Sequence, residues 1–129
     1  MATRVREVMT RRVVAVRGSQ LLTEAAILMK TDDLDALPVV SDDRVVGMIT
    51  DRDIVIRVIA EGLDPHAVRA GEVASRAVVV ARPDQEVADA LREMARSEVR
   101  QLPVVEDDHL VGIISRSDAV AATQPTAHH

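Results

Sequence analysis

Short apolar runs alternate with polar turns along this chain, and the runs follow two different periods. The β-branched runs 13–16 and 78–81 predict strands. After each run, apolar residues recur at helical spacing, and Ser19 and Asp84 are suited to cap these helices. The apolar faces of the two predicted helices carry Leu22, Ala25, Ala26 and Met29 in the first, and Val87, Ala90, Leu91 and Met94 in the second.

Proline and acidic pairs mark the elements that follow each helix. Pro38 and Pro103 cannot lie inside a helix, so the Leu-Pro-Val-Val runs around them predict short strands. Polar turns at 41–43 and 106–108 then predict hairpins. The remaining predicted elements are strands 45–49 and 110–114, a helix from Asp51 to about Glu61, and a shorter helix from Arg116 to near Thr123.

The order strand, helix, strand, strand, helix therefore occurs twice, and the sequence itself is repeated. Leu37-Pro38-Val39-Val40 returns as Leu102-Pro103-Val104-Val105, an offset of 65 residues that holds without a gap. The repeat divides the chain into a first domain (5–61), a linker (62–71), a second domain (72–123) and a tail (124–129). The polar tail ends in two histidines, and we expect it to be disordered or the remnant of a purification tag.

Composition excludes several classes of function. A net charge of −5, a pI near 5.3 and the absence of aromatic residues argue against nucleic-acid binding. Without cysteine there is no disulfide, thiolate metal site or cysteine nucleophile. The start of the chain does not resemble a signal peptide, and no apolar run is long enough for a membrane span, so we expect a cytoplasmic protein. His66 and His109 lack ligand spacing, so no metal site is predicted.

Thr50-x-x-Asp53 and Ser115-x-x-Asp118 are the candidate functional motifs, one in each repeat. A hydroxyl residue at a helix start with an acid three residues later resembles a capping box, which is a structural role. The alternative is ligand binding, because a carboxylate has lone pairs for two adjacent hydroxyl groups. Three arginines near these helix starts either neutralise a phosphate, remain solvated or pair with a neighbouring aspartate: Arg52, Arg57 and Arg116.

The repeated strand-helix-Leu-Pro-Val-strand unit, closing each time in Gly-apolar-apolar-Thr/Ser-x-x-Asp, resembles a tandem pair of CBS domains (cystathionine β-synthase type), also called a Bateman module. The stretch from Gly47 to Ile56, followed by Ala60-Glu61-Gly62-Leu63-Asp64-Pro65, is similar to small stand-alone bacterial CBS-pair proteins of the hypoxic-response type. This resemblance implies an α+β fold in which two β-α-β-β-α repeats pack about a pseudo-twofold axis, and a role in a stress response.

The resemblance also implies a ligand and its binding residues. Family members hold AMP, ADP, ATP or S-adenosylmethionine in clefts between the repeats, and the Thr/Ser and Asp of each motif contact phosphate and ribose. Carried over, these roles fall on Thr50, Asp53, Ser115 and Asp118, with Arg52 and Arg116 near phosphate and Val14, Pro38, Val79 and Pro103 around the base. The first strands have Ala15 and Val80 where threonine is common, so one polar contact is missing in each repeat.

Three functions remain open at this point. The leading hypothesis is a non-catalytic sensor that binds an adenine nucleotide, forms a homodimer and signals to a protein partner, without a catalytic cofactor. The second is a CBS pair without ligand that serves as a dimerisation or protein-interaction module. An enzyme is the third and least favoured, because the repeats occupy nearly the whole chain and no nucleophile–base arrangement emerges.

Overall fold

The computed structural model describes residues 2–76 and 78–123, and its contacts divide the chain into two compact units. The first unit is the continuous segment Val14–Val78. The second unit joins the N-terminal segment Met1–Val13 to Val79–His129. The predicted disordered tail at 124–129 lies outside the described residues. Within the described part of the chain, no helix combines the length and the apolar content that a membrane span needs.

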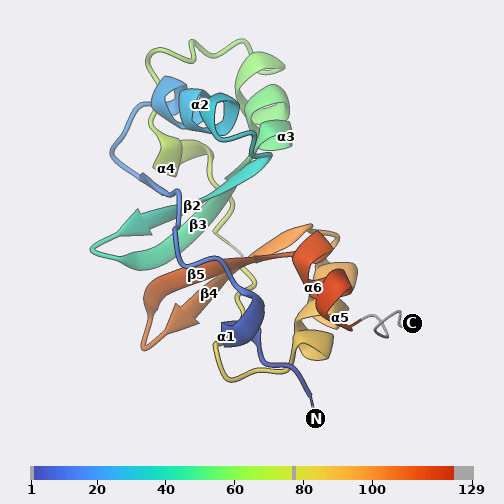
Figure 1. Ribbon diagram of the computed structural model, residues 1–129. Coiled ribbons are helices and arrows are strands. Elements are labelled where there is room, and N and C mark those ends of the chain that lie inside the picture. The colour runs from blue at the N-terminus through green and yellow to red at the C-terminus, as the bar shows by residue number, and fades with distance from the viewer. Residues whose placement is uncertain (1, 77, 124–129) are drawn as a thin grey trace. The chain divides into compact units, whose positions relative to one another are not determined.

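The first unit contains helices and the paired strands β1 (Val16–Arg17), β2 (Ala36–Ser41) and β3 (Arg44–Thr50) (Figure 1). β1 pairs in parallel with β2, Val16 lying opposite Val39, and β2 pairs antiparallel with β3, Ala36 lying opposite Thr50. The elements in chain order are β1 (Val16–Arg17), α2 (Leu22–Thr31), β2 (Ala36–Ser41), β3 (Arg44–Thr50), α3 (Asp51–Ile54), the π-helix η1 (Val55–Ile59) and α4 (Ala70–Val73).

The second unit repeats this plan around one hairpin (Figure 1). Gln101 lies opposite Ser115 at the open end of the hairpin, and Ala81 adds a single parallel bridge to Val104. The elements are α1 (Val5–Val8), α5 (Val87–Ser97), β4 (Gln101–Glu106), β5 (His109–Ser115) and α6 (Arg116–Thr123). The predicted strand-helix-strand-strand-helix order is thus confirmed in outline, and the fold is the mixed α and β fold that the sequence predicts.

Each unit has its own apolar core, built from equivalent positions of the repeat. The helix faces predicted from the sequence supply part of each core, because one apolar stripe of each helix lies against the sheet. Ala26, predicted on that stripe, is exposed instead. The fully buried members include Leu22, Leu37, Ile49 and Val58 in the first unit, and Val87, Met94, Leu102 and Ile114 in the second.

The predicted hairpin turns are confirmed, and their geometry is unusual for their composition. Asp42 and Asp43 both have positive φ, at 52° and 66°, and so do Asp107 and Asp108, at 51° and 69°. Two-residue turns with both central residues in this region match the right-handed twist of the strands that they join. Aspartate tolerates the left-handed conformation better than most side chains, although glycine would adopt it without strain.

The predicted bounds of the first strand in each repeat are wrong in detail. β1 covers only Val16 and Arg17, and the equivalent run 78–81 forms one bridge rather than a strand. The Gly18 N–H still reaches the Val40 carbonyl at 3.3 Å, whereas Pro83, its counterpart, has no N–H to donate. The pairing in the second unit therefore cannot extend as it does in the first.

The predicted caps are also wrong, because each helix begins two residues later than expected. Leu21 and Glu86 are the N-cap residues, not Ser19 and Asp84. Gln20 explains the difference: its side chain accepts the Arg17 N–H at 2.8 Å and closes a turn before the helix. Gln85 does the same for the Arg82 N–H at 3.0 Å. The predicted helix 51–61 forms, but as α3 continued by the π-helix η1.

The segments that precede the two repeats are exchanged between the compact units. The Leu22 N–H donates to the Val68 carbonyl at 2.8 Å, and the equivalent Val87 N–H donates to the Thr3 carbonyl at 2.9 Å. Residues just before the first repeat thus complete the second unit, and residues just before the second repeat complete the first. The sequence repeats and the compact units are therefore two different divisions of the same chain.

Candidate functional site

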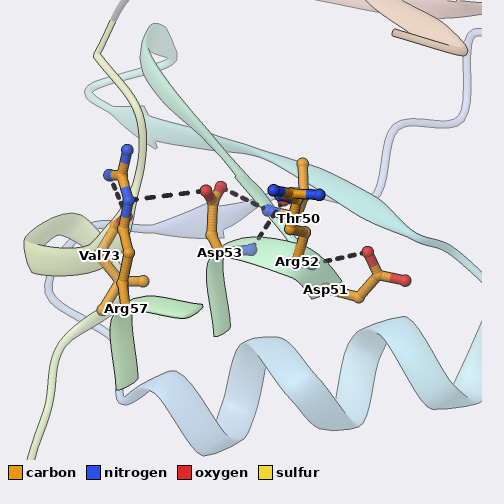
Figure 2. Close-up of polar contacts among 6 residues, drawn as sticks. All are labelled: Thr50, Asp51, Arg52, Asp53, Arg57 and Val73. Carbon is orange, nitrogen blue, oxygen red and sulfur yellow. Dashed lines mark hydrogen bonds and ion pairs between the residues drawn. The ribbon is translucent and has the colours of Figure 1, made fainter. Parts of the chain in front are cut away.

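The first candidate motif lies where β3 passes into α3. Thr50 is the last residue of β3 and the N-cap of α3. Its Oγ1 accepts the Asp53 N–H at 3.0 Å, and its own N–H donates to Asp53 Oδ2 at 3.0 Å (Figure 2). This reciprocal pair is a capping box with aspartate in the position usually held by glutamate or glutamine. The structural role considered for the motif from the sequence is therefore present.

Arg57 adds a second partner to the same carboxylate. Its Nε lies 3.7 Å from Asp53 Oδ1, and its Nη1 donates to the Val73 carbonyl at 3.0 Å (Figure 2). The Asp53 side chain is 17% exposed and the Arg57 side chain 51% exposed. The i, i+4 spacing of the two residues was the sequence signal for this pair. The Val73 contact was not predictable, since it joins residues 16 apart through a loop.

The second motif has the same local position and a different set of contacts. Ser115 ends β5, and its Oγ accepts the Asp118 N–H at 3.2 Å. Ser117 lies beside it, with 3.3 Å between the two hydroxyl oxygens. Among the described residues, no hydrogen bond or ion pair reaches the Asp118 carboxylate, and Asp118 is exposed. The two acids predicted as ligand contacts therefore differ in their polar partners, as the difference between Arg52 and Ser117 in the two motifs allowed.

The remaining predicted site residues divide into buried and exposed groups. Pro38 and Pro103 are buried in β2 and β4, and Val14 and Val79 are partly buried against the two cores. Arg52 and Arg116 are exposed, and within residues 2–76 and 78–123 neither guanidinium takes part in an ion pair. Thr50 with Asp53, and Ser115 with Asp118, are the residues that hydrogen bonds bring together.

The potential metal ligands are dispersed over the described residues. No group of three histidine, cysteine, aspartate or glutamate side chains is placed to hold a metal ion within the part of the chain that the structure describes. The His66 ring lies in an exposed loop, with its Nδ1 3.3 Å from the Asp64 carboxylate. At each motif the hydroxyl oxygen accepts the backbone N–H of the acid three residues later, which is a helix-cap contact.

Comparison with known proteins identifies the family. The CBS domain family matches residues 5–60 and 70–124. Hypoxic response protein 1 of Mycobacterium tuberculosis is 39% identical over 117 residues, which cover 90% of this chain and 82% of that protein. The CBS domain-containing protein YhcV of Bacillus subtilis is 40% identical over 114 residues, 88% of this chain and 81% of that protein. The chain belongs to the CBS-domain family and is a tandem CBS pair.

Solved structures agree with this assignment. Hypoxic Response Protein I with two coordinated zinc ions matches with a TM-score of 0.87 and 39% identity, covering 95% of this chain and 100% of that one. A hexameric CBS-CP12 protein from bloom-forming cyanobacteria matches with a TM-score of 0.81 and 34% identity, covering 98% and 78%. The CBS domain pair of protein MJ0100, in complex with 5′-methylthioadenosine and S-adenosyl-L-methionine, matches with a TM-score of 0.82 and 24% identity, covering 94% and 95%.

These comparisons confirm the predicted family and the similarity to hypoxic-response proteins. They leave the ligand, the site residues and the partner of this chain as predictions, because what each similar protein binds is a property of that protein.

Proposed function

We propose that this protein is a non-catalytic regulatory module that binds an adenine nucleotide or S-adenosylmethionine through the carboxylates of Asp53 and Asp118. The observation that carries the proposal is Asp118, an exposed acid whose backbone N–H donates to the hydroxyl of Ser115 at the end of β5. Such a carboxylate can accept hydrogen bonds from two adjacent ribose hydroxyl groups. The MJ0100 pair supports the proposal at the level of the fold, since a module of this fold holds adenosyl ligands.

A thermal melt of the full chain, followed by circular dichroism, tests this function with AMP, ADP, ATP and S-adenosylmethionine in turn. A ligand at 100 times its dissociation constant adds about 2.7 kcal/mol to the free energy of unfolding. In a chain of this size that corresponds to a rise in Tm of several degrees. We expect one of the four compounds to raise Tm, and Asp118→Ala to reduce the rise. No shift with any of them would refute nucleotide binding at these sites.

A second candidate function, assembly with a second copy, rests on apolar side chains exposed on and after η1. Val55, Ile56 and Ile59 are 55%, 50% and 58% exposed, and Leu63 in the following loop is 49% exposed. Burying such residues against another copy would be favourable, at roughly 25 cal/mol per Å² of apolar surface. The cyanobacterial CBS-CP12 protein, which is hexameric, supports self-association in this family.

Analytical ultracentrifugation tests the assembly directly. We expect a dimer for the native chain and a monomer for Ile59→Glu, whose charge cannot be buried without a partner. Val46→Glu is the matched control, because Val46 is 46% exposed but lies in β3, away from η1 in the chain. A native chain that sediments as a monomer at all concentrations would rule out this function, and so would an Ile59→Glu variant that remains dimeric.

A further inference from the structure

The Asp53 carboxylate is occupied at both oxygens before any ligand arrives. Oδ2 accepts the Thr50 N–H at 3.0 Å, and Oδ1 faces Arg57 Nε at 3.7 Å. With 17% of its side chain exposed, Asp53 has little access to other hydrogen-bond donors. A carboxylate has about four lone-pair sites, so the Thr50 bond can persist when a ribose binds. The Arg57 guanidinium, by contrast, competes with the ribose for this mostly buried carboxylate.

Arg57 is held from two sides, so moving it disturbs more than the ion pair. Its Nη1 donates to the carbonyl of Val73, the last residue of α4. Carbonyl groups at the end of a helix lack partners within the helix, and a cationic side chain is a favourable donor to them. Arg57 thus ties the acid at the start of α3 to the end of α4, two points that lie 20 positions apart in the sequence.

The second repeat contains the same framework without the cation. Ala122 stands at the position of Arg57, and Val8 stands at the position of Val73 at the end of α1. Among the described residues the Asp118 carboxylate has no polar partner, and its N–H bond to Ser115 Oγ leaves both of its oxygens available. One residue, Arg57 in place of alanine, accounts for the ionic part of this difference.

We infer that Arg57 is a built-in competitor for the ligand of Asp53, so that an adenosine-type ligand occupies the Asp118 site first and the Asp53 site second. The inference rests on the proposed function, since it concerns the same ligand and the same carboxylates. When the second ligand binds, its ribose displaces Arg57 from Asp53, and the tie to α4 loosens. The two sites thereby differ in affinity, and occupancy of the Asp53 site alone is transmitted to α4.

The size of the effect follows from the exposure of the pair. Arg57 is half exposed, and ion pairs in such a setting contribute little, so the competition corresponds to about a two- to fivefold difference in affinity. A difference of this size sets the order in which the two sites fill and still allows a ligand to bind at the Asp53 site.

Isothermal titration of the full chain with adenosine and with AMP separates the two sites. Asp118→Ala leaves only the Asp53 site, and Asp53→Ala leaves only the Asp118 site. In the Asp118→Ala background we expect Arg57→Gln to bind adenosine about two to five times more tightly. In the Asp53→Ala background we expect Ala122→Gln to change nothing. If Arg57→Gln leaves adenosine affinity unchanged or weakens it, Arg57 is no competitor, and a loss confined to AMP would make it a phosphate contact instead.

A reciprocal variant asks whether the cation is sufficient. Ala122→Arg places a guanidinium four residues after Asp118, with the Val8 carbonyl as the counterpart of the Val73 carbonyl. We expect it to weaken adenosine binding at the Asp118 site by about two- to fivefold relative to Ala122→Gln. Equal affinities for the two variants would contradict the inference. Circular dichroism confirms beforehand that each variant is folded.

Failure of the proposed function gives a different result. If neither adenosine nor AMP binds to the native chain or to either single-site variant, nucleotide binding itself is refuted. The tie between Arg57 and α4 is then judged without ligand, by hydrogen exchange at the amides of Ala74 and Ser75, which follow α4 directly. We expect Arg57→Gln to speed their exchange about two- to fivefold relative to Ala122→Gln. Unchanged exchange would show that Arg57 does not hold α4.

Discussion

Met48 and Ser75 exchange two backbone hydrogen bonds, the Met48 N–H donating to the Ser75 carbonyl at 2.9 Å and the Ser75 N–H to the Met48 carbonyl at 2.8 Å. Ile113 and Thr10 repeat this bridge in the second unit, with distances of 3.0 and 2.8 Å. The bridges bring the N-terminal part of each repeat across the middle of a strand of the other repeat, with Ser75 beside β3 and Thr10 beside β5. They explain why a glycine precedes Met48 and Ile113 in both repeats.

Substituting these glycines tests how closely the crossing segments approach. A Cβ at Gly47 would lie 2.9 Å from the Ser75 carbonyl oxygen and 3.1 Å from Ala74 Cβ, neither of which can move without shifting backbone. We expect Gly47→Ala to lower the free energy of unfolding by about 1–3 kcal/mol, the usual cost of overpacking. Chemical denaturation followed by circular dichroism measures the change.

Gly112 provides the matched comparison. There the nearest atom is the Met9 Sδ at 2.8 Å, at the far end of a flexible side chain, although the Thr10 carbonyl oxygen also lies at 3.0 Å. We expect Gly112→Ala to be less destabilising than Gly47→Ala, because methionine adapts its rotamers at low cost. A larger effect at Gly112 than at Gly47 would mean that the two crossings differ in a way that these distances do not describe.

The exchange of segments also predicts which of the two units a mutation near the N-terminus destabilises. Val5 in α1 is fully buried, and it packs in the core that α5, β4 and β5 share. We expect Val5→Ala to destabilise this unit by about 1–3 kcal/mol through the cavity that it leaves. Hydrogen exchange should show loss of protection in 87–115 and little change in 22–50. Loss of protection confined to 22–50 would contradict the division of the chain into these units.

Whether a feature of the fold could be predicted from the sequence depends on how far apart along the chain its interacting residues lie. The hairpins, most of the helix faces and the capping motifs at Thr50 and Ser115 were predictable, because each depends on residues within about one turn or one strand of each other. The duplication was visible because Leu-Pro-Val-Val returns at a fixed offset. The exchange of segments between the two units was not predictable, since a repeat in the sequence does not indicate which unit a preceding segment joins.

The same limit applies to the candidate site. Thr50 and Asp53 were predicted together from their spacing, and so was the alternative that they form a cap. The inequivalence of Asp53 and Asp118 depends on Arg57 and on the carbonyl of Val73, which a loop brings into reach. Part of this difference was visible in the sequence, because Ala122 stands at the position of Arg57 in the second repeat. The exclusion of Ser19 and Asp84 as caps depended on side-chain bonds of Gln20 and Gln85 that favour a turn.

The two capping motifs predict unequal costs of mutation. Thr50 takes part in a reciprocal pair of bonds with Asp53, whereas Ser115 accepts one bond from Asp118 at 3.2 Å. We expect Thr50→Ala to cost about 1–2 kcal/mol and Ser115→Ala about 0.5–1 kcal/mol in free energy of unfolding. Denaturant titration of each variant, with Thr50→Ser as a control that retains the hydroxyl, measures the difference. Equal costs would show that the Thr50 N–H bond to Asp53 adds nothing to stability.

The hairpin turns offer a route to a more stable protein. Asp43 and Asp108 are the second central residues of their turns and have φ values of 66° and 69°, a conformation that costs L-residues about 1 kcal/mol and glycine little. Glycine is also the residue most favoured at this place in two-residue hairpins. We expect Asp43→Gly and Asp108→Gly each to raise the free energy of unfolding by about 0.5 kcal/mol, less than the full strain because glycine also gains freedom in the unfolded chain. Asp43→Ala is the control, since alanine keeps the strain and loses the carboxylate. A gain in stability for Asp43→Ala equal to that for Asp43→Gly would trace the effect to charge rather than to the backbone.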